Sequence, residues 1–319
     1  MTTISPNLSS EVDLSVAVGS VRLPNPVMTA SGTAGHGSEL DRYVPLATLG
    51  AHVVKSLAAF EWKGNPSPRL HPTPLGMLNS VGLQGPGVRA WLADDLPALE
   101  RTGARIVASI WGRTVSEFRQ AAELMAGARP SVVAVEVNLS CPNLEGGRHL
   151  FAHSPDDSAE VVAAAAACGR PLWAKLTAAT DRLVEVAAAV AEAGAEALTL
   201  INTVPGLAID LDSRRPVLGG GGGALSGPAI HAVAVRAVFD VHAALPDTPI
   251  VGVGGVTRGV DAVELILAGA SAVQVGTATF ADPRAAGRVL AELTQWCRSH
   301  GIDRISDLCG DVHRRQVQR

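Results

Sequence analysis

The chain has 319 residues and a formal net charge of −4, and 18% of its residues are charged. This length suits one large α/β barrel or two ordinary domains, and a mean hydropathy of +0.24 indicates a large buried core. The near-neutral charge argues against nucleic acid as a main partner, because phosphate binding requires clustered Lys and Arg.

The amino-terminal segment and the cysteines bear on the cellular compartment and on possible disulfide or metal sites. The segment lacks the basic start and apolar stretch of a signal peptide, and no apolar run approaches the roughly 20 residues of a membrane helix. We therefore expect a cytoplasmic protein with no membrane partner. The cysteines are Cys141, Cys168, Cys297 and Cys309. They form no C-x-x-C pair, so they support neither a disulfide nor a metal site and argue against an iron–sulfur cluster held by this chain.

Short Val- and Ile-rich runs alternate with Ala- and Leu-rich segments along most of the chain. The expected strands are 25–32, 52–56, 105–112, 131–140, 171–177, 197–203, 249–256 and 272–280. The expected helices are 88–101, 115–127, 155–168, 181–193, 228–244, 259–268 and 283–298. Near-continuous apolar strands followed by helices are typical of a parallel sheet covered on its faces. Eight such units favour a closed (β/α)8 TIM barrel over an open, doubly wound sheet.

Two connections are longer than a barrel needs. Residues 57–87 are rich in proline and glycine, and residues 204–227 contain "LAIDLDSRRPVLGGGGGALSG", which predicts a small hairpin with a Gly-rich return. Long ordered loops in a compact domain are usually functional or mobile, and in a barrel the loops that follow strands form the active-site face. We expect one barrel domain over residues 1–319, with an N-terminal hairpin and long loops after strands 2, 4 and 6.

Polar and small residues stand at the carboxyl-terminal tip of almost every expected strand. They are Ser31, Gly32, Lys55, Ser56, Ser109, Asn138 to Cys141, Lys175, Asn202, Thr203, Gly254, Gly255, Gly276 and Thr277. Any one of them alone is explained by a solvated strand end, and Cys141 alone by a small buried side chain filling a gap. Together they predict a catalytic rim. Lys55 and Lys175 end apolar runs, where a lysine must find an anion, lose its proton or extend its ammonium group to solvent.

Three glycine-rich stretches precede expected helices: "VGVGGVTRG", "VGTATF" and "GGALSGPAI". Glycine lets the backbone approach a phosphate closely, and helix N-termini present N–H groups with a favourable dipole. The loops after strands seven and eight of such barrels are a common phosphate site. The pattern therefore predicts a phosphate-bearing ligand without identifying it. No G-x-G-x-x-G turn opens the chain, so a dinucleotide-binding fold is not indicated.

As a set, these motifs resemble those of the class 1 dihydroorotate dehydrogenases, flavin enzymes of pyrimidine biosynthesis. The resemblance runs from "NPVMTASGT" to "GTATFADP". "GNPSPRLHPTPLGMLNSVGLQGPG" and "INTVPGLAIDLDSRRPVLGGGGGALSGPAI" are similar to the class 1B forms of two loops, whereas "NLSCPN" is shared more widely. The resemblance implies bound FMN and oxidation of dihydroorotate to orotate. It also implies an electron-transfer subunit with FAD and an iron–sulfur cluster that passes electrons to NAD, around a homodimer core or in a heterotetramer.

The resemblance also implies a role for each matching position. The residues that would border FMN are Ser31, Gly32, Lys55, Ser56, Asn138, Lys175 and Ile201. Those that would enclose its phosphate are Gly227, Gly254, Gly255, Gly276 and Thr277. Dihydroorotate would be held by Lys55, Asn79, Ser80, Val81, Gly82, Leu83, Asn138, Asn202 and Thr203, with Cys141 as the base. Class 1B relatives often have Asn where this chain has Ser109, which can still hydrogen-bond a flavin edge.

Three alternatives remain open from the sequence. A flavoenzyme resembling dihydropyrimidine dehydrogenase would share the barrel, the FMN and the "NLSCP" turn. A class 1A enzyme would be a homodimer that uses fumarate. A binding protein that kept the barrel without the chemistry is disfavoured by the presence of Lys55, Lys175 and Cys141.

Overall fold

The computed structural model describes residues 12–140 and 150–316, and its centre is a parallel eight-stranded sheet. The strand order is β3-β16-β15-β10-β9-β8-β7-β4. The two end strands meet, because Gly50 N donates to Val27 O at 2.8 Å and Thr29 N donates to Ala51 O at 3.3 Å. The expected (β/α)8 barrel is confirmed. Its strands are β3 (Val27–Thr29), β4 (His52–Val53), β7 (Ile106–Ile110), β8 (Val132–Asn138), β9 (Leu172–Leu176), β10 (Ala197–Leu200), β15 (Ile250–Val253) and β16 (Ala272–Val275).

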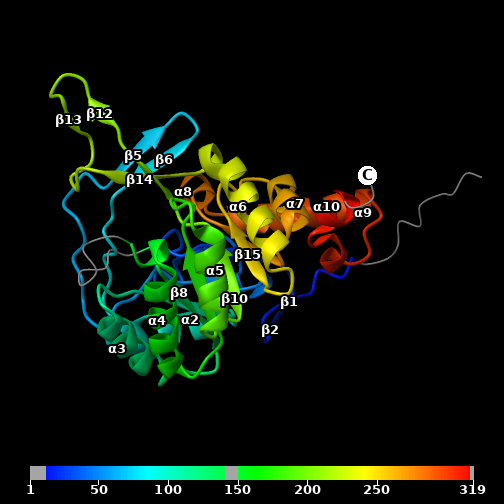
Figure 1. Ribbon diagram of the computed structural model, residues 1–319, viewed down its shortest axis with the longest axis horizontal. Helices are drawn as coiled ribbons and strands as arrows, with labels where there is room; N and C mark the ends of the chain where they lie inside the picture. The colour runs from blue at the N-terminus through cyan, green and yellow to red at the C-terminus, as the bar shows by residue number, and fades with distance from the viewer. Residues whose placement is uncertain (1–11, 141–149, 317–319) are drawn as a thin grey trace, which may run out of the picture.

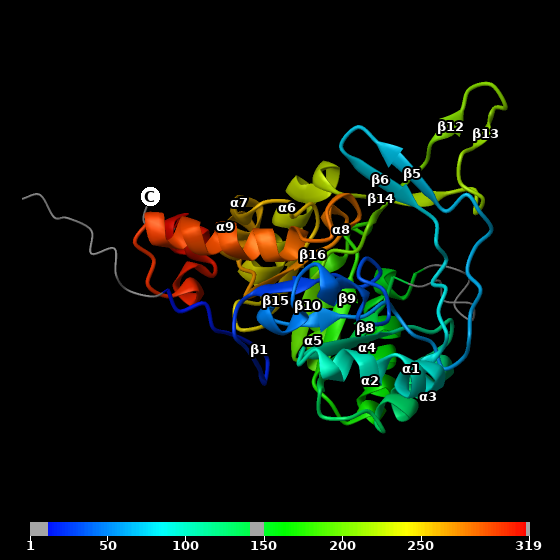
Figure 2. The same cartoon turned by 180° about the vertical axis from the view of Figure 1, so that it is seen from behind.

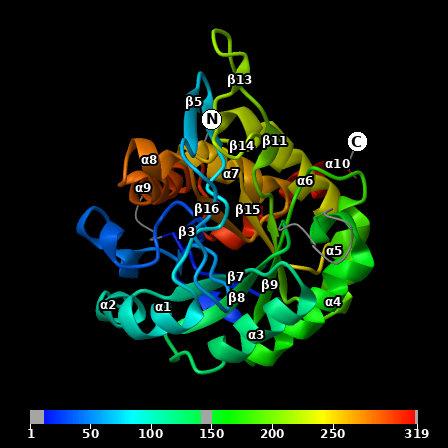
Figure 3. The ribbon, with the colours of Figure 1, turned by 90° about the vertical axis from the view of Figure 1, so that its left-hand side faces the viewer.

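The helices form an outer layer around these strands (Figure 3). They are α1 (Val88–Asp94), α2 (Leu96–Arg101), α3 (Val115–Met125), α4 (Pro155–Ala165), α5 (Leu183–Glu192), α6 (His231–Ala244), α7 (Gly259–Ala268), α8 (Ala278–Ala281), α9 (Ala285–Ser299) and α10 (Asp311–Gln316). Because helices cover the outside and side chains fill the inside, a strand such as β7 is buried at every residue. Across the described ranges, no helix is long and apolar enough to cross a membrane.

Several expected strands end two or three residues earlier than expected, and two expected elements differ more substantially. Residues 272–280 were expected to form one strand, but β16 ends at Val275 and the chain turns into helix α8. Thr279 N donates to Gly276 O at 2.9 Å, so the turn begins at this glycine despite the β-branched threonines that follow it. The expected helix 88–101 is divided into α1 and α2. Pro97, in the first turn of α2, lacks the N–H that an unbroken helix would use there.

The expected N-terminal hairpin is confirmed and consists of β1 (Val16–Val18) and β2 (Val21–Leu23), paired antiparallel. Ser20 N in its turn donates to the Glu196 carboxylate at 2.8 Å. Glu196 directly precedes β10, so the hairpin lies at the amino-terminal end of the barrel strands. This position leaves the opposite end of the barrel free for the long loops.

The two long connections pair with each other, which the sequence did not indicate. A four-stranded antiparallel sheet has the order β11 (Val204–Gly206), β14 (Gly223–Ser226), β6 (Gly76–Asn79) and β5 (Leu70–Thr73). The predicted hairpin in residues 204–227 is β12 (Ile209–Asp210) with β13 (Arg215–Pro216). Figures 1 and 2 show both hairpins projecting from the same side of the molecule. Ala224 lies beside Asn79 in this sheet, which brings the loops after strands 2 and 6 together over one end of the barrel.

Candidate active site

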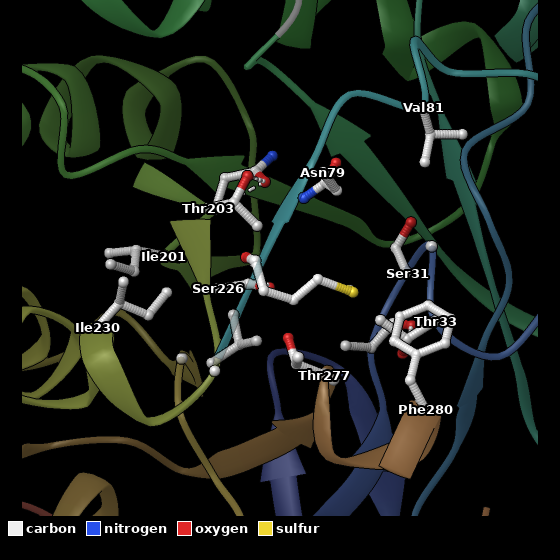
Figure 4. Close-up of a pocket in the computed structure, with 18 of the residues that line it drawn as sticks. Ser31, Thr33, Asn79, Val81, Ile201, Thr203, Ser226, Ile230, Thr277 and Phe280 are labelled. Atoms are coloured by element: carbon white, nitrogen blue, oxygen red, sulfur yellow. Dashed lines mark hydrogen bonds between the residues drawn. The ribbon is translucent and has the colours of Figure 1, made fainter. Parts of the chain in front are cut away.

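A cavity of about 280 Å³ opens at the carboxyl-terminal ends of the barrel strands. All barrel strands except β7 contribute lining residues from their ends or from the loops that follow, and β6 and β14 add Met77, Asn79 and Ser226. Figure 4 shows Ser31, Asn79, Thr203 and Thr277 around the same open space. In barrels of this type the carboxyl-terminal face carries the catalytic residues. This cavity is therefore the candidate active site.

Most of the residues predicted from the sequence line this one cavity. They are Ser31, Gly32, Lys55, Ser56, Asn79, Val81, Gly82, Leu83, Asn138, Lys175, Ile201, Asn202, Thr203, Gly227, Gly254, Gly255, Gly276 and Thr277. The predicted base, Cys141, lies outside the described residues. Ser140, which precedes it, does line the cavity.

Two predicted residues lie behind the wall of the cavity rather than in it. Ser109, on β7, is fully buried, and its Oγ is 2.8 Å from Ser56 Oγ. Ser80 is also buried, and its Oγ accepts a hydrogen bond from Asn65 Nδ2 at 2.9 Å. Both hydroxyls are therefore engaged with protein groups. Ser109 is linked to the cavity through Ser56, and its predicted hydrogen bond to a flavin edge stays a prediction.

A chain of hydrogen bonds fixes the polar side chains of the cavity. Ser56 Oγ is 3.2 Å from Ser31 Oγ and accepts from Asn138 Nδ2 at 3.3 Å. Asn138 Oδ1 accepts from Asn202 Nδ2 at 3.1 Å and from Ser140 N at 3.2 Å. Because the Asn138 oxygen has two donors, its amide nitrogen must face Ser56. The network fixes the donors and acceptors presented to a bound ligand.

The ionisable side chains among the described lining residues are Lys55 and Lys175. Lys175 is 7% exposed at its side chain, and its Nζ lies 3.6 Å from Glu136 Oε1. Burial lowers the pKa of Lys55, and the charge of Arg69 lowers it further. Nearby His36 has a pKa lowered to about 4, first by burial and then by Lys55, so it is neutral near pH 7. With two ammonium groups in its wall, the cavity suits an anionic ligand.

The glycine-rich end of the cavity brings backbone close to any ligand. Gly255 has a φ of +70°, and a Cβ there would lie 2.6 Å from His231 Cβ. Gly254 has a φ of +141°, and a Cβ there would lie 2.7 Å from Ala234 Cβ. Only glycine fits both the backbone angle and the space at these two positions. They are held against α6, whose first residue, His231, donates from Nδ1 to Gly254 O at 2.8 Å. This surface suits a phosphate.

Sequence reasoning missed several lining residues. Thr33 and Ser226 adjoin predicted positions, and their place beside a strand end or in a glycine-rich loop was a usable signal. Phe280 was hidden because residues 272–280 were interpreted as strand, whereas α8 presents it to the cavity. Met77 and Leu70 belong to the long loop 57–87 that was expected at the active-site face, but nothing in the sequence singled them out within it. The pairing of β6 with β14 brings their hairpin to the cavity.

Comparisons with known proteins point to one family. The model of the family described as "Dihydroorotate dehydrogenase" matches residues 13–296. Two similar curated proteins are each named "Dihydroorotate dehydrogenase B (NAD(+)), catalytic subunit". The protein of Pelobacter propionicus is 46% identical over 299 residues, covering 93% of this chain and 98% of its own length. The protein of Desulforudis audaxviator is 46% identical over 305 residues, covering 95% of this chain and 99% of its own.

Proposed function

The chain belongs to the dihydroorotate dehydrogenase family, and from this premise we propose that it oxidises (S)-dihydroorotate to orotate in de novo pyrimidine biosynthesis. The observation that carries the proposal is the cavity, in which two lysines and three asparagines, Asn79, Asn138 and Asn202, line the wall. Dihydroorotate has a carboxylate and a ring of alternating N–H and carbonyl groups. Ammonium groups match the carboxylate, and amides supply both donors and acceptors to the ring.

The proposed cofactor is FMN, and the residues present fit it. Gly254 and Gly255 pack so closely against α6 that a Cβ at either position would collide with Ala234 or His231, and their bare backbone suits the close approach of a phosphate. Lys175 supplies a positive charge that would balance the negative charge a flavin gathers on reduction. Bound FMN would supply the hydride acceptor. The residues proposed to hold it are Ser31, Gly32, Lys55, Ser56, Asn138, Lys175, Ile201, Gly227, Gly254, Gly255, Gly276 and Thr277.

The proposed substrate contacts come from three segments of the cavity wall. They are Lys55, Asn79, Val81, Gly82, Leu83, Asn138, Asn202 and Thr203, and Ser80 belongs to the same segment as Asn79. The hydrogen bond from Thr203 N to Asn202 Oδ1 at 2.7 Å and that from Asn202 Nδ2 to Asn138 hold these amides in fixed orientations. A fixed amide edge lowers the entropy lost when the ring is bound. Asn138 would orient the ring, and Lys55 would pair with the carboxylate.

Cys141 is the proposed base. Oxidation removes a proton from C5 of dihydroorotate and a hydride from C6, and the proton needs a base within reach of the ring. A thiol has an unperturbed pKa of about 8.5 and becomes a useful base with modest tuning. Its neighbour Ser140 lines the cavity, so Cys141 is adjacent in the chain to the site where it would act.

The proposed partner is an electron-transfer subunit with FAD and an iron–sulfur cluster. The relatives' names include "catalytic subunit" and "NAD(+)", which supports a second subunit and NAD as the final acceptor. We place the assembly in the cytoplasm, built on a homodimer core or as a heterotetramer, with residues 1–319 forming one FMN-binding domain in each chain.

The first expected result is one FMN per chain, bound without a covalent link. The purified protein should be yellow, and denaturation should release a flavin that chromatography identifies as FMN. Release of FAD alone, or no flavin after reconstitution with FMN, would contradict the cofactor assignment. Reduction of the bound flavin by dihydrouracil rather than dihydroorotate would instead indicate an enzyme resembling dihydropyrimidine dehydrogenase.

The second expected result concerns Lys55 and pH. Orotate binding should weaken as pH rises through the lowered pKa of Lys55, because only the ammonium form pairs with a carboxylate. The weakening should therefore begin below the ordinary lysine range. Lys55→Met should raise the dissociation constant of orotate about ten- to a hundred-fold near pH 7, which corresponds to the ~1.5–3 kcal/mol of a charged hydrogen bond.

Flavin absorbance changes during orotate titrations from pH 7 to 10 measure both effects. Lys63→Met is the matched control, since Lys63 is exposed and does not line the cavity. A Lys55→Met variant with the same affinity and the same pH dependence as the unmodified chain would rule out the proposed pairing.

A further inference from the structure

A carboxylate that does not line the cavity is buried directly behind one of its lysines. Glu136, on β8, is fully buried in the barrel interior. Its side chain meets Lys175 on β9, Thr199 on β10 and Gln274 on β16. Since β16 is not a neighbour of β8 in the sheet, these side chains meet across the inside of the barrel.

The two carboxylate oxygens of Glu136 have different surroundings. Oε2 accepts from Gln274 Nε2 at 2.8 Å and from Thr199 Oγ1 at 3.2 Å. Oε1 lies 3.6 Å from Lys175 Nζ, and within the described residues no group donates a hydrogen bond to it. One oxygen is therefore anchored by neutral donors, while the other faces the ammonium group.

This arrangement is costly unless both charges are present. The side chains of Lys175 and Glu136 are 7% and 0% exposed, so water does little to stabilise either charge. Removing one partner of a buried ion pair leaves the other charge uncompensated. Glu136 therefore supplies the opposite charge that the buried Lys175 ammonium group faces, at 3.6 Å.

The carboxylate also restrains where that charge lies. Lysine has a long, flexible side chain, whereas Glu136 is fixed by Gln274 and Thr199 from two other strands. Because pairs of packed hydrophobic residues are often at least as stabilising as a buried ion pair, stability alone does not explain this one. Lys175 lines the cavity and Glu136 does not, so the pair links the cavity wall to the barrel core.

We propose that Glu136 is a positioning residue that holds the Lys175 ammonium group at the cavity wall, with Thr199 and Gln274 holding the carboxylate in place. This inference rests on the proposed function, because it requires that the charge of Lys175 acts on bound FMN. A positive charge beside the flavin favours its reduced, more negative form. Glu136 should therefore raise the reduction potential of bound FMN through Lys175, without contact with the cofactor.

The test is a double-mutant cycle read by the midpoint potential of bound FMN. Glu136→Gln keeps the shape of the side chain and removes its charge. It should lower the equilibrium constant for two-electron reduction of the bound FMN at least tenfold, which corresponds to a midpoint potential lower by about 30 mV. Lys175→Met should lower it similarly, and adding Glu136→Gln to Lys175→Met should change nothing further. Glu192→Gln is the charge-matched control, because Glu192 is exposed at the end of α5, and it should leave the potential unchanged.

Three results would overturn the inference. The first is an unchanged midpoint potential in Glu136→Gln, and the second is a raised one. The third is that Glu136→Gln lowers the potential equally in the presence and absence of Lys175. If Glu136→Gln does not fold or retain FMN, Thr199→Val replaces it, since this change keeps the charge and removes one donor to Oε2. Thr199→Val should lower the midpoint potential by less than Glu136→Gln does, and it should have no effect in the Lys175→Met background. A lowered potential in that background counts against the inference.

The potential is measured with dyes and a chemical reductant, so no substrate is needed. Failure of the proposed function and failure of this inference are therefore distinguishable. A chain whose FMN is not reduced by dihydroorotate would refute the function, while the cycle would still report on Glu136. A chain that binds no FMN would refute both.

Discussion

Replacing Cys141 with alanine is expected to slow reduction of the bound flavin by dihydroorotate by a factor of about 10²–10⁴, the usual contribution of a general base. FMN should remain bound, because Cys141 is not among the residues proposed to hold it. Cys141→Ser should retain activity only at high pH, since a hydroxyl is a far poorer base than a thiol. Rapid mixing without oxygen, followed by flavin absorbance, measures the rate.

The chain offers matched controls for this variant. Cys168→Ala and Cys297→Ala remove thiols that are buried in the described structure and do not line the cavity. Burial raises the pKa of both thiols, which suits an inert side chain rather than a base. Both variants should reduce flavin at the unmodified rate. An alanine variant at position 141 that reacts at the unmodified rate near pH 7 would exclude Cys141 as the base.

The isolated chain is expected to reduce artificial dyes with dihydroorotate but to reduce NAD barely at all. No Rossmann fingerprint and no clustered cysteines occur in its sequence, so nothing in the sequence predicts an NAD site or a metal cluster that would relay electrons. NAD reduction should appear when the electron-transfer subunit is added, and it should increase with added subunit until the two proteins are equimolar.

Steady-state assays with a dye, with NAD and with fumarate separate the possible acceptors. Rapid NAD reduction by the chain alone would show that no partner is required. Rapid fumarate reduction would move the assignment to the class 1A enzymes. Gel filtration of the chain alone and with the subunit then distinguishes a homodimer core from a heterotetramer.

The barrel was predictable because its signal is local. Each strand is a short apolar run buried on both faces, as in β7 and β9, and helical segments alternate with most of the strands. The polar tips were predictable for the same reason, since parallel strands bring their carboxyl ends to one face. Lys55, Asn138 and Asn202 therefore line the same cavity although they are far apart in the sequence.

The remaining features depend on contacts between distant segments. The pairing of β6 with β14 joins Asn79 to Ala224, and neither loop alone indicates the other. Ser109 has the right position in the sequence but bonds to Ser56 instead of facing the cavity. Glu136 precedes Asn138 by two residues in a run that reads as an ordinary buried strand. Its importance appears only when Lys175, Thr199 and Gln274 are placed around it.

The most direct test of the central claim is an anaerobic titration of the purified, FMN-loaded chain with (S)-dihydroorotate. The account predicts that the absorbance of the oxidised flavin is lost, and that one orotate forms for each flavin reduced. Flavin that stays oxidised in excess dihydroorotate, with no orotate formed, would contradict the account.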